Sequence, residues 1–268
     1  MMRNGKLTIT DKIILRSREL YLRVIPFRYV NDNYRDSFVS KREIAPNRSL
    51  AKAEEVIYGF WTGTNELSEN RKRGLELMRK NAGVEVRLVT PRNLDTYILP
   101  EYPLHPAYEY LSLVHKADYL RCYFMLHHGG GYSDVKPCFH SWKRAFAQLN
   151  RSDRWCLGYR EKFGGTPRIE GKIGEDINWY YSILIGMGSF IFKPYSSIAQ
   201  EWMEELHHRL DLLLPDLKSH PGNVLGDNEG YPVAWSFILA QILHPILLKY
   251  HRYLIQNNDI RPQFHDYR

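Results

Sequence analysis

Short apolar runs alternate with longer stretches of helical periodicity along most of the chain. The runs at 56–60, 84–89 and 155–159 are rich in Val, Ile, Leu and aromatic residues and are bounded by polar residues, which predicts buried strands. Apolar residues at three- and four-residue spacings predict helices at 68–80 (with Ser68 as N-cap), 111–127, 141–149 and 196–214. Strands that alternate with helices are typical of the α/β class.

Three other segments have weaker patterns. Residues 91–106 are loop-rich with one short predicted helix, and the polar, glycine-rich segment 163–175 predicts a mobile loop that closes over a substrate. Small and apolar residues around Gly186 and Gly188 predict strand, turn and strand over 181–192. No internal repeat or low-complexity tract is visible, so we expect one domain at 54–268.

The first 53 residues form a predicted extension of this domain. Residues 12–25 interleave Lys and Arg with Ile, Leu and Tyr, as a helix lying on a membrane surface does. The same pattern fits a helix packed on the domain with its basic face in solvent. The polar stretch 31–53, which contains Pro46, predicts a linker.

The densest chemistry lies between residues 115 and 139. In the predicted helix, Asp118 and Arg121 are three residues apart and so share one face. Gly129 and the two glycines after it break the helix, because glycine enters positive-φ turns without steric cost. A short strand then ends at Asp134, and the carboxyl ends of strands are where ligands bind in open α/β sheets. The segment therefore predicts a ligand site.

These residues resemble the sugar-binding glycosyltransferases of family 32, whose pattern is approximately [SA]-D-x-x-R-x-x-x-L-x-x-x-G-G-x-Y-x-D-x-D. The positions that match are Ala117, Asp118, Arg121, Met125 or Leu126, Gly129 to Gly131, Tyr132 and Asp134. Residues 56–63 are similar to the family's first strand, which ends in an aromatic pair that receives the nucleotide base.

The resemblance implies a single-domain GT-A fold, which is a Rossmann-like nucleotide-diphospho-sugar transferase fold, and retention of anomeric configuration. It also implies a donor site that includes both segments. The residues expected to bind the donor are Phe60, Trp61, Gly63, Asp118, Arg121, Gly130, Gly131, Tyr132 and Asp134.

One position departs from the family pattern: Lys136 stands where the family has its second aspartate. That aspartate holds Mn²⁺ or Mg²⁺ against the diphosphate, and an ammonium group has no lone pair with which to bind a metal. Lys136 then either neutralises the departing diphosphate itself, or marks a site that binds without catalysis. In a third interpretation, Asp134 holds a metal together with a downstream acidic residue.

Candidates for that downstream residue are Asp227 and Glu229, in the glycine- and proline-rich segment 220–230. This segment loosely resembles the family loop that closes on the diphosphate and the acceptor. We count both residues as candidate catalytic groups or metal ligands, with a solvated surface turn as the alternative. Similarly, Asp118 and Arg121 could form an ordinary surface ion pair, and Phe60 and Trp61 could belong to the core.

Composition narrows the class of partner. The 37 Lys and Arg exceed the 30 Asp and Glu, for a net charge of +7, which favours anionic ligands such as nucleotide diphosphates or lipid phosphates. A basic nucleic-acid-binding domain is the minor alternative, because no nucleic-acid-binding module is recognisable. Three cysteines without metal-ligand spacing favour a reducing compartment. With no recognisable signal peptide or long apolar run, we expect a cytoplasmic protein, peripheral at a membrane if residues 12–25 bind there.

Together these patterns predict a hexosyltransferase of polysaccharide biosynthesis, of the capsule or O-antigen type. Asp134 and Lys136 would be its catalytic groups, with Asp227 and Glu229 as further candidates. The donor would be a nucleotide-diphosphate sugar, the acceptor a glycan or lipid-linked oligosaccharide, and Mn²⁺ or Mg²⁺ a doubtful cofactor. A nucleotide-sugar-binding protein without turnover is the alternative.

Overall fold

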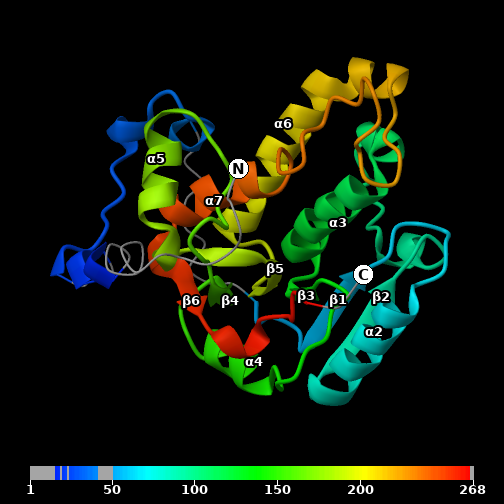
Figure 1. The fold of residues 1–268 in the computed structure, drawn as a ribbon, viewed down its shortest axis with the longest axis horizontal. Helices are drawn as coiled ribbons and strands as arrows, with labels where there is room; N and C mark the ends of the chain where they lie inside the picture. The colour runs from blue at the N-terminus through cyan, green and yellow to red at the C-terminus, as the bar shows by residue number, and fades with distance from the viewer. Residues whose placement is uncertain (1–15, 19, 23, 42–50, 266–268) are drawn as a thin grey trace.

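The computed structural model describes residues 16–18, 20–22, 24–41 and 51–265. Its centre is a six-stranded sheet of order β2-β1-β3-β5-β4-β6 (Figure 1). The strands are β1 (Val56–Phe60), β2 (Glu85–Val89), β3 (Gly130–Ser133), β4 (Cys156–Arg160), β5 (Ile185–Phe192) and β6 (Leu254–Gln256). The predicted α/β class is confirmed, with a mixed sheet.

β5 runs against the other strands of the sheet. β1 pairs in parallel with β2 and β3, and β4 pairs in parallel with β6, whereas β5 is antiparallel to both of its neighbours, β3 and β4. The carboxyl ends of β3 and β4 therefore meet at the same edge of the sheet, although β5 lies between them.

Helices cover both faces of the sheet. The α-helices are α2 (Glu69–Asn81), α3 (Leu113–His127), α4 (Lys143–Asn150), α5 (Gly171–Trp179), α6 (Ser197–Ser219) and α7 (Ala240–Lys249). Short 3₁₀ helices are η1 (Asn31–Tyr34), η2 (Phe38–Ser40), η3 (Leu94–Tyr97), η4 (Pro106–Tyr110), η5 (Tyr181–Ile183), η6 (His251–Tyr253) and η7 (Asn258–Ile260). Ser68 caps α2 as predicted, since its side chain accepts a hydrogen bond from the Arg71 amide.

The alternation of side chains along the strands divides the interior into two cores. Ile57 of β1 points to the smaller core, where it joins Met78 of α2 and Phe146 of α4. Its neighbour Tyr58 points to the larger core, which contains residues of α3, α5, α6 and α7, including Trp202. The sheet is thus the middle layer of three.

Two predictions for the middle of the chain were wrong. The predicted loop 163–175 ends early, because α5 begins at Gly171, and the predicted turn within 181–192 is a continuous strand, β5. Gly186 does not turn the chain; it makes room for a ring, since a Cβ there would lie 2.1 Å from Cζ of Tyr159. Helix α6, which was predicted to end at residue 214, continues through Pro215 to Ser219.

The early part of the predicted linker packs on the domain. Tyr34 and Val39 are buried, and the Tyr34 hydroxyl donates a hydrogen bond of 2.8 Å to Asp176 of α5. Before it, Arg18 donates to the carbonyl of Asn178 and lies 4.3 Å from the ring centre of Trp179. The remainder of the linker, 42–50, and the start of the predicted amphipathic segment, 12–15, lie outside the described residues.

No helix in the described part of the chain has the length and apolar character needed to cross a bilayer. Cys122, Cys138 and Cys156 are all buried free thiols.

Candidate active site

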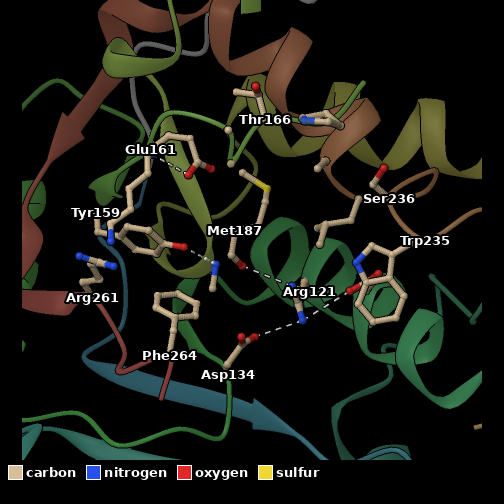
Figure 2. A pocket seen from close by; sticks show the side chains of 18 of the residues that line it. Arg121, Asp134, Tyr159, Glu161, Thr166, Met187, Trp235, Ser236, Arg261 and Phe264 are labelled. Atoms are coloured by element: carbon tan, nitrogen blue, oxygen red, sulfur yellow. Dashed lines mark hydrogen bonds and ion pairs between the residues drawn. The ribbon is translucent and has the colours of Figure 1, made fainter. Parts of the chain in front are cut away.

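A cavity of about 680 Å³ opens where the chain leaves β3 and β4 (Figure 2). Its lining comes from α3, from the turns that follow β3 and β4, from β5, from the segment before α7 and from residues that follow η7. The lining residues used below are Asp118, Arg121, Asp134, Tyr159, Glu161, Phe163, Gly165, Met187, Gly188, Trp235, Ser236, Arg261 and Phe264.

Arg121 joins the two acidic residues that the sequence pattern predicted. Its Nη2 lies 3.4 Å from Asp118 Oδ1 and 3.2 Å from Asp134 Oδ1, while Nη1 donates to the carbonyl of Met187 at 3.3 Å. The side chains of Arg121 and Asp118 are only 13% and 4% exposed. The alternative of an ordinary surface ion pair is therefore wrong.

Both oxygens of Asp134 are held. Oδ1 accepts from the Tyr132 hydroxyl at 2.5 Å as well as from Arg121, and Oδ2 accepts from Lys136 Nζ at 2.6 Å. Burial acts to raise the pKa of Asp134, but the charges of Arg121 and Lys136 and the hydrogen bonds outweigh it, so the pKa is lowered. Asp134 is consequently a carboxylate at neutral pH.

Asp118 is in a different electrostatic position. Burial raises its pKa to about 6; Arg121 opposes this shift, and the nearby charge of Asp134 adds to it. Two carboxyl groups around one guanidinium thus have pKa values pushed in opposite directions, which is a common feature of catalytic and binding sites.

Lys136 lies beside the cavity and is not among its lining residues. Its side chain is 9% exposed, and Nζ lies 4.5 Å from the ring centre of Phe264, which does line the cavity. The backbone beside Phe264 is held near the turn that follows β3, because the Gln263 amide donates to the carbonyl of Pro137 at 3.0 Å. The ammonium group of Lys136 therefore contacts Asp134 on one side and the ring of Phe264 on another.

The residues around Asp134 do not fit a divalent cation. Mn²⁺ and Mg²⁺ need several oxygen ligands, and both oxygens of Asp134 already accept hydrogen bonds from Tyr132, Arg121 and Lys136. Across the residues that the structure describes, no group of three His, Cys, Asp or Glu side chains is placed to hold a metal.

Asp227 and Glu229 are not brought to this site. Both are exposed on the loop after α6, and Asp227 Oδ1 accepts from Asn223 Nδ2 at 2.7 Å within that loop. The metal site shared between Asp134 and this loop is not formed, so here the surface-turn alternative describes the structure. The loop contacts the amino-terminal turn of α3, where Asn223 O accepts from the Leu113 amide, but neither acidic side chain is among those that line the cavity.

The predicted base-binding segment lies outside the cavity lining. Phe60 is 7% exposed, stacks on Tyr132 at 5.4 Å between ring centres and packs edge-on against Phe124, so it belongs to the core. Trp61 is partly exposed and donates from Nε1 to the carbonyl of Asn65 at 2.7 Å. Gly63 lies beyond it, on the same turn.

The glycines of the motif have backbone roles. Gly130 has a φ of +81°, and at Gly131 a Cβ would lie 3.0 Å from the ring of Trp142. Both are buried in β3 and do not line the cavity. They let the strand pass close to its neighbours and so place Tyr132 and Asp134.

Several residues that line the cavity were not predicted from the sequence. Tyr159, Glu161, Trp235, Arg261 and Phe264 come from three separate segments, and no motif spacing connects these segments. The one useful signal was the predicted active-site loop, whose first residues, from Phe163 to Pro167, do line the cavity. Within the described residues, the buried Nε atoms of Arg121 and Arg261 have no hydrogen-bond partner.

The fold and the site define an α/β protein with an open cavity, lined in part by charged side chains, at the carboxyl ends of β3 and β4. Comparison with protein-family models gives no match, and comparison with curated proteins gives none either. Among solved structures, the chain is similar to one described as PaToxG Glycosyltransferase, at 12% identity and a TM-score of 0.43, over 91% of this chain and 80% of that one.

Proposed function

We propose that this chain is a glycosyltransferase that moves a hexose from a nucleotide-diphosphate sugar to a hydroxyl group of a glycan. The observation that carries the proposal is the meeting of Asp118, Arg121 and Asp134 in one cavity at the end of β3. The sequence pattern linked these three residues to a sugar-nucleotide donor, and it did so independently of their spatial arrangement.

The chemistry of the cluster fits such a donor. Ionised carboxylates accept hydrogen bonds from sugar hydroxyls, and a guanidinium donates to phosphate oxygens in pairs. Asp118 and Asp134 supply the first kind of group. Arg121 supplies the second, with Arg261 further along the same wall.

We further propose that transfer proceeds without a metal ion. Asp118, Asp134, Arg121 and Lys136 together carry no net charge when both carboxyls are ionised, and Lys136 holds the oxygen of Asp134 that a metal would need. The positive charge that stabilises the departing diphosphate then comes from Arg121, Arg261 and, once Phe264 moves aside, Lys136.

In the reaction, the bond from the sugar C1 to the diphosphate oxygen breaks and a bond from C1 to the acceptor oxygen forms. With retention of configuration, the departing phosphate takes the proton of the acceptor hydroxyl, so no protein nucleophile is required. The diphosphate leaves with that proton.

The setting we propose is polysaccharide assembly at the cytoplasmic face of a membrane, with a lipid-linked oligosaccharide as acceptor. Support comes from the helical turns that precede η1, where Leu20, Val24 and Ile25 are 63%, 72% and 52% exposed. Exposed arginines, Arg16 and Arg28, accompany them, and such a surface suits an anionic membrane.

The test is a panel of UDP-, GDP-, dTDP- and ADP-sugars, each with Mn²⁺ and with EDTA, read by thermal shift and by slow hydrolysis of the donor. We expect one nucleotide class to raise the melting temperature and to be hydrolysed equally with EDTA. A requirement for Mn²⁺ would overturn the metal-free mechanism. Binding without hydrolysis or transfer would identify a nucleotide-sugar-binding protein, and no response to any donor would refute the proposal.

A further inference from the structure

The end of the cavity opposite the Asp134 cluster has its own buried carboxylate. Glu161 follows β4 directly and is 7% exposed. Its Oε1 accepts from the Lys162 amide at 2.8 Å, and its Oε2 lies 3.3 Å from Nε2 of His244. Figure 2 shows Glu161 and Arg121 on opposite sides of Met187.

His244 contacts Glu161 from outside the cavity lining. It belongs to α7, its side chain is 0% exposed, and it is not among the residues that line the cavity. Glu161 is therefore the only member of the pair that a ligand in this cavity can reach. Burial acts to raise the pKa of Glu161, but the nearby His244 ring, the hydrogen bond from the Lys162 amide and the charge of Arg261 outweigh it and lower the pKa, so the group is an acceptor-only carboxylate.

The surrounding loop is shaped to this carboxylate. At Gly165 a Cβ would lie 2.3 Å from Glu161 Oε1, so only glycine lets the loop from Phe163 to Pro167 pass this closely over the glutamate. Exposed aromatic rings stand at the rim, with Phe163 46% and Trp235 65% exposed. Rings of this kind offer an apolar face to a sugar.

A buried charge is costly unless it is paired and used. Keeping an ionised carboxyl at 7% exposure carries a desolvation penalty, and an apolar residue of similar size would pack at less cost. The Lys162 amide donates to this carboxylate and His244 lies 3.3 Å from it, and its position on the cavity wall makes it accessible to a ligand.

We propose that Glu161, held in place by His244, forms the acceptor end of the cavity and binds a hydroxyl group of the acceptor sugar. The inference rests on the proposed function, since the Asp118, Arg121 and Asp134 cluster takes the donor. Glu161 accepts the hydrogen bond of an acceptor hydroxyl, which orients the sugar toward C1 of the donor across Met187. His244 is a positioning residue that fixes the carboxylate.

The experiment compares transfer with hydrolysis in the full chain. With the donor that the wild type hydrolyses, p-nitrophenyl α- and β-glycosides of glucose, galactose, mannose and N-acetylglucosamine are offered as acceptors, and the ratio of glycoside product to free sugar is measured. We expect Glu161→Gln to lower this ratio at least tenfold and to raise the KM for the glycoside more than that for the donor. His244→Asn should lower it about threefold, and Glu161→Asp should keep part of it.

Glu205→Gln is the matched control, because Glu205 is equally buried and ion-paired, to Arg209 at 2.9 Å, but does not line this cavity. It should leave the ratio unchanged. An unchanged ratio in a folded Glu161→Gln variant overturns the inference, as does a wild type that hydrolyses the donor but accepts none of the glycosides. A wild type that hydrolyses no donor overturns the proposed function first, and the inference with it.

Discussion

Replacing Lys136 by Met tests whether the ammonium group exists to balance Asp134. Methionine is close to lysine in length, and it removes the charge, the hydrogen bond of 2.6 Å to Asp134 Oδ2 and the ammonium contact with the Phe264 ring. The Asp134 side chain is 17% exposed, so its charge would then depend on Arg121, which it shares with Asp118. The three charges that remain in the cluster would sum to −1, where the present four sum to zero.

The expected loss follows from this geometry. Breaking a buried ion pair by removing one partner costs about 3–5 kcal/mol, and the contact that Arg121 keeps reduces this to about 2–3 kcal/mol. For a chain of this size, each kcal/mol corresponds to about 2–4 °C in Tm, so we expect a fall of about 5–10 °C at pH 7. Urea unfolding followed by tryptophan fluorescence measures the free energy directly, since Trp142, Trp155 and Trp202 are buried.

The pH dependence supplies the decisive check. In the wild type the lowered pKa of Asp134 contributes stability that is present above its unfolded pKa and is lost as the pH falls through the folded value. In Lys136→Met the folded pKa is higher, so the difference between the two proteins should be largest at neutral pH and should close on acidification.

Lys72→Met is the control, because Lys72 makes a comparable contact of 2.9 Å to Glu69 on an exposed helix face and should leave the unfolding midpoint unchanged. A Lys136→Met protein as stable as the wild type at pH 7 would refute the charge-balance explanation.

Three further predictions concern other parts of the molecule. Because the pKa of Asp118 is raised to about 6, donor binding should increase as the pH rises through about 6. Asp118→Asn, titrated in parallel, should bind the donor weakly at every pH and show no such increase. The raised pKa also contributes stability that is fully present below the unfolded pKa of about 4 and is lost as the pH rises through about 6. Gly186→Ala should lower the free energy of unfolding by about 1–3 kcal/mol in urea titrations, since its Cβ would lie 2.1 Å from Tyr159, while Gly59→Ala, whose Cβ would lie 3.4 Å from Val135, should cost less. Leu20→Asp with Val24→Asp should reduce co-sedimentation with phosphatidylserine-containing vesicles and leave donor hydrolysis intact; equal sedimentation would refute a membrane role for these exposed side chains.

Much of the fold could be predicted because local signals and tertiary packing agree. The strand at Val56–Phe60 is an unbroken apolar run and is buried throughout, and Ser68 caps its helix as its position suggested. The site cluster was also accessible, because Asp118 and Arg121 are one helical turn apart and Asp134 follows the strand that their helix leads into.

The errors came from residues whose role is decided by distant partners. Gly186 has the sequence context of a turn, but the ring of Tyr159 from the neighbouring strand occupies the space beside it. Likewise, Phe60 stands at a strand end where an aromatic residue could bind a nucleotide base. In the structure it belongs to the core, because the rings of Tyr132 and Phe124 pack against it. No local pattern contains this information.

The same reason explains why Glu161 was missed. It is one acidic residue at the end of an apolar strand, and its significance depends on His244, which lies on a helix far along the chain. The acidic cluster at Asp227 had the stronger sequence signal, but its side chains are exposed and do not line the cavity.

Residues 261–265, which follow η7, bear on the order in which the cavity forms as the chain is synthesised. Phe264 covers Lys136, and the Gln263 amide bonds to Pro137, so a wall of the cavity is built from residues made long after Asp118 and Arg121. During synthesis, α3 and β3 can pair with β1 while this wall is still missing, since their contacts are nearer in sequence. The end of the cavity near Asp134 is thus completed only when residues 261–265 reach the turn beside Asp134.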